Sequence, residues 1–192
     1  MIEGRVAVIG WGSLLWDLDD LAPRVAGDWR RGAGPRLPLE FSRISPKRRM
    51  GLVVCIDEAL GALCATHAVA STRAEVAAAR ADLARRERAP AALIGWAEAR
   101  TGRGEGRALG RVLDWCRAGG AAGAVWTELR PNWAEHRAEP WSLDAAEAYL
   151  AGLAGEAREE AVRYIASAPA ETDTPLRRRL AARDWWRAEA AR

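Results

Sequence analysis

The chain opens with a run of β-branched apolar residues that leads directly into small ones. Val6, Val8 and Ile9 are typical of a buried strand, because β-branched side chains pack well on a pleated sheet. The residues after them are rich in glycine, which lets a chain turn and leaves backbone N–H groups accessible to a ligand. They are Gly10, Trp11, Gly12, Ser13, Leu14 and Leu15. The pattern predicts a strand that ends in a loop able to bind a small molecule.

Further apolar runs predict more strands in the first two thirds of the chain. Alternating or continuous apolar residues mark residues 37–45, 52–56, 62–69, 91–97 and 122–127. Asp57–Gly61 has the composition of a tight turn, so the strands on either side of it are expected to pair as a hairpin, with Cys55 opposite Cys64. Residues 17–28 contain a proline and a glycine and are expected to be irregular.

Helical spacing replaces the strand pattern after residue 71. Thr72 and Glu75 form a capping-box pattern, which predicts a helix from there to about residue 88, ahead of Pro90. A second helix is expected at residues 107–117. Three more are expected to begin at Ser142, Glu156 and Thr174. Strands with helices packed around them predict an α+β fold.

The composition is that of a globular protein and excludes several classes of function. The chain has 192 residues, 49% of them hydrophobic and 29% charged. The net charge of +3 is too small to indicate a nucleic-acid partner. No apolar run is long enough for a membrane span and no secretory signal is evident, so a cytoplasmic location is expected. Three cysteines and two histidines lack metal-ligand spacing, so we expect no metal site and no disulfide framework.

One acidic residue lies on the apolar face of the helix that is predicted to begin near residue 72. Val76, Leu83 and Glu87 fall on one side of a helix, whereas Asp82 and Arg86 fall elsewhere. An inward carboxylate at a helix C-terminus meets a desolvated environment and the negative end of the helix dipole, and both make it a better base. Glu87 is therefore a candidate general base. The alternative is a frayed helix end at which Glu87 pairs with Arg80 or Arg88.

Two segments together resemble the gamma-glutamylcyclotransferase superfamily. Residues 10–15 resemble its Tyr-Gly-Ser-Leu loop, with Trp11 in place of the tyrosine, and Leu83–Glu87 is similar to the Leu-x-x-Arg-Glu stretch of the ChaC-like branch. The resemblance covers roughly the first 100 residues. It implies a small mixed or antiparallel β-barrel-like core with flanking helices in residues 1–140. Residues 141–192 would be a C-terminal helical extension packed on the same domain.

The resemblance also implies a reaction. The α-amine of a γ-glutamyl compound attacks its own γ-carbonyl, which releases 5-oxoproline and an amine without a cofactor or metal. Glu87 would be the catalytic acid and base, and residues 10–15 would bind the substrate. Arg43, on the strand predicted at residues 37–45, is a candidate for the substrate α-carboxylate. The expected partner is a small γ-glutamyl molecule, with no nucleic acid or membrane involved, and neither the leaving amine nor the oligomeric state is predicted.

Two alternatives stay open. Glu128 is a rival acid, because it follows the strand predicted at residues 122–127 and strand ends commonly supply active sites. The chain is alternatively a non-catalytic module that uses the same glycine loop to bind an acidic metabolite or peptide. The basic and aromatic residues near the C-terminus are expected to form an amphipathic helix packed on the rest of the protein.

Overall fold

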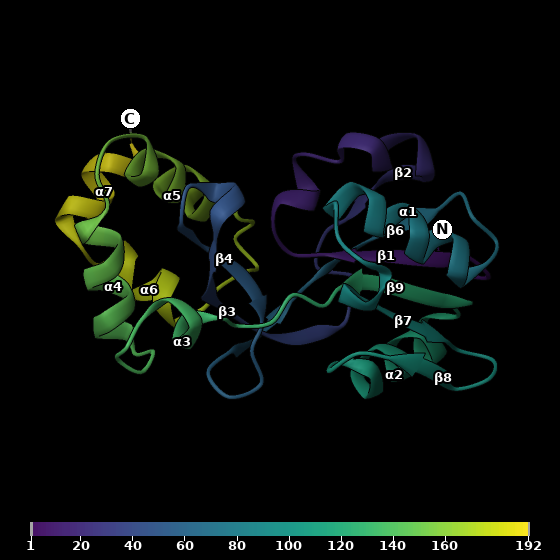
Figure 1. The fold of residues 1–192 in the computed structure, drawn as a ribbon. Coiled ribbons are helices and arrows are strands. Elements are labelled where there is room, and N and C mark those ends of the chain that lie inside the picture. The colour runs from purple at the N-terminus through teal and green to yellow at the C-terminus, as the bar shows by residue number, and fades with distance from the viewer. Residues whose placement is uncertain (1, 192) are drawn as a thin grey trace. The chain divides into compact units, whose positions relative to one another are not determined.

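The computed structural model describes residues 2–191 and shows a mixed α+β fold. Contacts divide the chain into two compact units, each made of two stretches of sequence. The first unit takes the residues up to Leu37 and Ala65–Leu129, and the second takes Pro38–Cys64 and the residues from Arg130 onward. Figure 1 shows the elements of both units. No helix within residues 2–191 is both long and apolar enough to span a membrane.

A six-stranded sheet is the framework of the first unit, with its strands in the order β2-β6-β1-β9-β7-β8 (Figure 1). The strands are β1 Val6–Gly10, β2 Val25–Arg30, β6 His67–Ser71, β7 Ile94–Glu98, β8 Arg103–Glu105 and β9 Gly123–Thr127. β1 runs parallel to β9 and antiparallel to β6. Every residue of β1 is buried, which explains why its sequence is a continuous apolar run instead of an alternating one.

Two helices and three short 3-10 segments complete the first unit. They are α1 Val76–Glu87, α2 Leu109–Gly119, η1 Ser13–Leu15, η2 Asp19–Arg24 and η4 Ala91–Leu93. α1 lies against β1, β7 and β9, where Leu83 packs with Val8 and Val125 in one buried cluster. Full burial of a side chain of this kind contributes about 1.5–3 kcal/mol, so the cluster fixes α1 on the sheet.

The second unit combines a three-stranded sheet, in the order β4-β3-β5, with helices from the C-terminal part of the chain. Its elements are β3 Arg36–Ser45, η3 Pro46–Arg48, β4 Gly51–Ile56, β5 Ala62–Ala65, α3 Trp133–His136, α4 Leu143–Gly152, α5 Gly155–Ser167, α6 Pro175–Ala181 and α7 Asp184–Ala190. α5 packs on β4, and Phe41 meets Tyr164 edge to face. Leu176, Leu180 and Trp186 are buried as expected, but the single amphipathic helix predicted near the C-terminus is divided into α6 and α7.

A buried carboxylate joins the two stretches of the second unit. Glu40 of β3 is fully buried, and its carboxylate accepts hydrogen bonds from the backbone N–H of Phe41 at 2.8 Å and of Leu176 at 3.2 Å. Burial raises the pKa of Glu40, while the side-chain hydrogen bond of Thr174 acts in the opposite direction. Residues 38–64 therefore pack with the C-terminal helices, so the compact units do not follow the expected boundary at residue 140.

The predicted hairpin between the strands at residues 52–56 and 62–69 is wrong. β3 lies between β4 and β5, and Cys55 pairs with Glu40 of β3 instead of with Cys64. The turn forms as its sequence indicates, because the N–H of Gly61 donates to the carbonyl oxygen of Asp57 at 2.9 Å. A Cβ atom on Gly61 would lie 2.6 Å from the carbonyl carbon of Pro38, so the turn passes over the start of β3. A local turn signal does not specify which strand becomes the neighbour.

Other local predictions have mixed outcomes. Residues 62–69 divide between β5 and β6, and residues 25–30 form β2 although an irregular segment was expected. α1 begins at Val76, and the Thr72 hydroxyl donates to the carbonyl oxygen of Arg24 at 3.2 Å instead of capping the helix. Ser142 and Thr174 cap their helices as predicted. Within residues 2–191 both sheets are open, so no closed barrel is found.

Candidate active site

Two parallel strands of the first unit end at the same edge of its sheet. β1 pairs with β9 in step, with Val6 opposite Gly123 and Val8 opposite Val125. Gly10 is the last residue of β1 and Thr127 is the last residue of β9. The glycine loop after β1 and the side chain of Thr127 therefore belong to one edge of the sheet. The carboxyl ends of parallel strands are a common place for ligand sites.

The loop after β1 forms a tight 3-10 turn, η1. The N–H of Leu15 donates to the carbonyl oxygen of Gly12 at 3.0 Å, and the N–H groups of Trp16 and Asp17 both donate to that of Ser13, at 3.2 and 2.9 Å. The N–H of Leu15 is thereby used inside the turn. In the part of the chain that the structure describes, no backbone carbonyl accepts from the N–H of Ser13 or Leu14. These are the donors that the start of a helical turn leaves for other acceptors.

The first glycine of the loop makes room for two large side chains. A Cβ atom on Gly10 would lie 2.8 Å from the indole ring of Trp29 and 3.1 Å from Cδ1 of Leu15. Leu14 is buried in the apolar cluster beneath α1, and Trp11 is also buried. The loop is therefore anchored by its apolar side chains. The Leu14 side chain belongs to the core and is therefore not left for contact with a ligand.

Helix α1 ends at Glu87 for a reason visible in the backbone. Arg88 adopts the left-handed conformation, with φ of 51°. Its N–H donates to the carbonyl oxygen of Arg85 at 3.0 Å, and the N–H of Ala89 donates to that of Ala84 at 3.0 Å. This is the hydrogen-bonding pattern of a helix C-terminus, and Pro90 then prevents continuation. The predicted helix end is confirmed, and Glu87 occupies its last turn.

The carboxylate of Glu87 lies at the same edge of the sheet as the loop. Its Oε1 atom accepts a hydrogen bond from the Thr127 hydroxyl at 3.5 Å and from Nη1 of Arg86 at 2.9 Å. Nη2 of Arg86 donates to the backbone carbonyl oxygen of Asp17, directly after the η1 turn. One guanidinium group thus contacts both the carboxylate of Glu87 and the chain that leaves the loop. The Glu87 side chain is 14% exposed.

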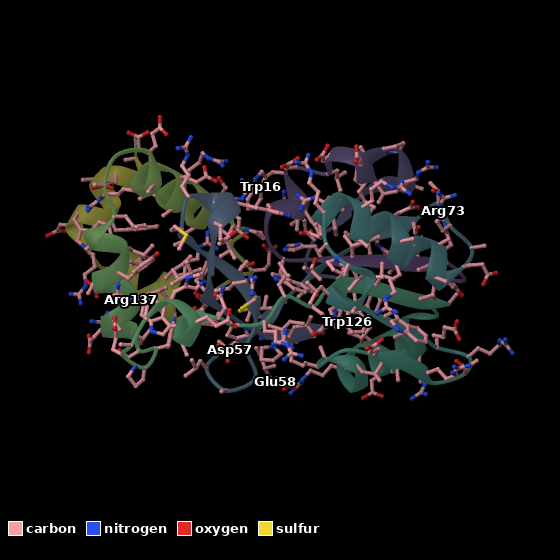
Figure 2. The ribbon with its side chains drawn as sticks, viewed as in Figure 1. Trp16, Asp57, Glu58, Arg73, Trp126 and Arg137 are labelled. Atoms are coloured by element: carbon pink, nitrogen blue, oxygen red, sulfur yellow. The ribbon has the colours of Figure 1, made fainter. Side chains whose placement is uncertain are left out.

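Glu128, the rival acid, is held differently. Oε1 accepts from the backbone N–H of Arg107 at 3.0 Å and from the indole N–H of Trp126 at 2.6 Å. Oε2 accepts from Nε of Arg107 at 3.0 Å. Trp126, labelled in Figure 2, fills the space beside Gly95, where a Cβ atom would lie 2.2 Å from its ring. Glu128 therefore joins the end of β9 to the start of α2, which is a structural task.

Asp82, which the helical spacing places away from the Glu87 face, is also buried. It is 3% exposed and accepts from Nε of Arg73 at 2.6 Å (Arg73 is labelled in Figure 2). Hydrogen bonding to Arg73, with the charges of Arg24 and Arg85 close by, lowers the pKa of Asp82 despite its burial. The arginines around this carboxylate are bound in a structural cluster.

Arg43 belongs to the second unit. Its Nη1 donates to the backbone carbonyl oxygen of Arg130 at 2.6 Å. This bond ties β3 to the chain ahead of α3, so the guanidinium already has a structural role. The predicted contact of Arg43 with a substrate carboxylate stays a prediction.

A pocket of about 530 Å³ lies in the first unit, at the opposite end of α1 from Glu87. Val76 at the start of α1 lines it together with Glu98 and Arg117. Its lining includes neither the glycine loop nor Glu87. This pocket is therefore separate from the edge of the sheet at which Glu87 lies.

Sequence reasoning missed two members of this site, Arg86 and Thr127. Arg86 is adjacent to Glu87 in the chain but lies off its helical face, and Thr127 is brought close only by the parallel pairing of β9 with β1. Among residues 2–191, no group of three or more histidine, cysteine or acidic side chains is arranged to hold a metal ion. Comparisons with family models, with curated proteins and with solved structures find no match to this chain.

Proposed function

We propose that the protein is a gamma-glutamylcyclotransferase-like enzyme that converts a γ-glutamyl compound into 5-oxoproline and an amine. The observation that carries the proposal is the double contact of Arg86, which joins the carboxylate of Glu87 to the backbone of Asp17 after the glycine loop. It supports a site in which one acidic group and the backbone N–H groups of the loop act on the same small molecule. The resemblance of both segments to that superfamily supplies the reaction.

The proposed reaction needs one group that first accepts and then donates a proton. Glu87 takes a proton from the α-ammonium of the substrate, and the freed amine attacks the γ-carbonyl carbon to close a five-membered ring. The C–N bond to the leaving amine then breaks, protonated Glu87 returns its proton to the leaving nitrogen, and the ring nitrogen loses its second proton to solvent, which leaves the neutral lactam of 5-oxoproline. Such acid–base catalysis contributes roughly 10²–10⁴-fold. Holding the two reacting groups of one molecule together removes a further share of the barrier, up to about 7–11 kcal/mol.

The other predicted residues take supporting roles in this proposal. The N–H groups of Gly12, Ser13 and Leu14 stabilise the negative oxygen that develops on the γ-carbonyl. Thr127 and Arg86 donate hydrogen bonds to Oε1 of Glu87 and hold this carboxylate in place for the proton transfer. The buried free cysteines support a reducing, cytoplasmic location.

The experiment is a screen of purified protein against glutathione, γ-glutamyl amino acids and a γ-glutamyl-lysine isopeptide. Mass spectrometry measures 5-oxoproline release, and the α-glutamyl isomers of the same peptides serve as substrate controls. We expect release from at least one γ-linked compound and none from its α-linked isomer.

The same screen tests the non-catalytic alternative. Gly12→Val places a branched side chain in the loop, so it should abolish binding of the best compound, measured by calorimetry. Gly110→Val is the matched control, because a Cβ atom there has no neighbour within 4 Å. Binding without turnover in the parent, lost in Gly12→Val, identifies a binding module. If the parent neither binds nor turns over any of these compounds, the proposed function is rejected.

A further inference from the structure

We infer that Arg86 is a positioning residue, which sets the carboxylate of Glu87 against the glycine loop. The inference rests on the proposed function for its kinetic consequences, but its structural part is independent of the reaction. Arg86 does not need to touch the substrate. Its proposed task is to keep two parts of the site in one arrangement while protons move.

The contacts of Arg86 form a continuous path from the loop to the carboxylate. Ser13 accepts a hydrogen bond from the N–H of Asp17 at 2.9 Å, and the carbonyl oxygen of Asp17 accepts one from Nη2 of Arg86. Nη1 of the same guanidinium donates to Oε1 of Glu87 at 2.9 Å. The guanidinium is planar and rigid, so its two donors fix the direction of one acceptor relative to the other. The loop and the carboxylate consequently move together.

Burial distinguishes Arg86 from the other arginines at the end of α1. Its side chain is 8% exposed, whereas those of Arg85 and Arg88 are 55% and 75% exposed. Within residues 2–191, Nε of Arg86 is buried and makes no hydrogen bond. A buried charge with one unused donor opposes folding, and departures of this kind are concentrated at functional sites. The ion pairs of Arg86 with Glu87, at 2.9 Å, and with the Asp17 carboxylate, at 3.9 Å, offset part of this cost.

The bridging geometry also predicts how lysine would perform in its place. A lysine ammonium is a compact charge on a flexible stem and lacks the planar pair of donors. It would keep the positive charge beside Glu87 while loosening the link to Asp17. The kcat of Arg86→Lys should therefore lie between that of the parent and that of Arg86→Gln, which removes the charge as well.

The test measures kcat and KM separately for the parent, Arg86→Gln and Arg86→Lys, with the compound that the screen identifies. Misplacement of a reacting group by about 1 Å costs up to 10²-fold, so we expect kcat of Arg86→Gln to fall by about 10- to 100-fold while KM stays the same. Arg85→Gln is the matched control, since this exposed neighbour contacts Asp82 at 3.5 Å and should leave kcat unchanged. An unchanged kcat in Arg86→Gln, or an equal loss in Arg85→Gln, overturns the inference.

Amide hydrogen exchange keeps the inference testable if no compound is turned over. Arg86→Gln should speed exchange of the amides of Trp16 and Asp17 relative to Arg85→Gln, because the carbonyl oxygen of Asp17 loses its partner. If Arg86→Gln does not fold, the same comparison is made with Arg86→Lys. Faster exchange without turnover in the parent rejects the proposed function and keeps the positioning role. Unchanged exchange at these amides overturns the positioning role whatever the activity.

Discussion

Two carboxylates at the ends of neighbouring elements of the first unit have opposite surroundings. Glu128 is fixed by a backbone N–H, an indole N–H and a guanidinium, all between 2.6 and 3.0 Å. Glu87 is held by the side chain of Arg86 at 2.9 Å and by the Thr127 hydroxyl at 3.5 Å. Glu128 is thus tied to a backbone N–H as well as to side chains, whereas the two donors described here for Glu87 are both side chains. The contrast assigns Glu128 to the fold and Glu87 to the proposed chemistry.

Among the variants that test this comparison, Glu128→Gln is expected to have the largest effect on stability. The amide NH₂ group of glutamine would face Nε of Arg107, so two donors would meet and a partly buried charge would lose its partner. We expect the free energy of unfolding, measured by urea denaturation, to fall by about 1–3 kcal/mol. Glu58→Gln is the control, because that side chain is exposed on the second unit. A change no larger than that of the control would show that Glu128 does not have the structural role assigned to it.

A smaller, pH-dependent effect is expected at Asp82, the other buried carboxylate of α1. The hydrogen bond from Arg73 holds the pKa of Asp82 below its ordinary value of 3.8, so its ionised form contributes stability that is present above that value. This contribution is lost as the pH falls through the lower pKa of the folded state. The stability difference between the parent and Asp82→Asn should therefore be constant between pH 7 and pH 5 and shrink below about pH 4.

The pKa of Glu40, in the second unit, is shifted in the opposite direction. Its effect on the pH dependence of stability must therefore be separated from that of Asp82. Burial raises its pKa, so its contribution is greatest at low pH and is lost as the pH rises through the folded-state pKa. Comparing the parent with Asp82→Asn at each pH cancels Glu40, which both proteins contain. A difference that grows towards acid pH would contradict the ion-pair account of Asp82.

Patterns within one element predicted the local structure of this chain well. The apolar run of β1, the end of α1 at Glu87 and the caps at Ser142 and Thr174 all depend on residues a few positions apart. The α+β class followed from the same patterns. Such signals are local because each arises from one turn or one strand face.

Long-range relations were not predictable in the same way. The place of β3 between β4 and β5 depends on pairing between strands, and the meeting of Thr127 with Glu87 depends on parallel pairing across the sheet. Arg86 was missed because helical spacing assigns a face but does not show what lies against that face. In the same way, the position of Glu128 after a predicted strand did not reveal the donors that hold it.

The most direct test of the central claim compares Glu87→Gln with Glu128→Gln in the 5-oxoproline assay, with the same γ-glutamyl compound and under conditions in which both variants are folded. Glutamine keeps the size of the side chain and removes its basicity. We expect Glu87→Gln to lower kcat by roughly 10²-fold or more while the compound still binds, and Glu128→Gln to keep most of its turnover. Unchanged turnover in Glu87→Gln, or a greater loss in Glu128→Gln, would contradict the assignment of Glu87 as the acid and base.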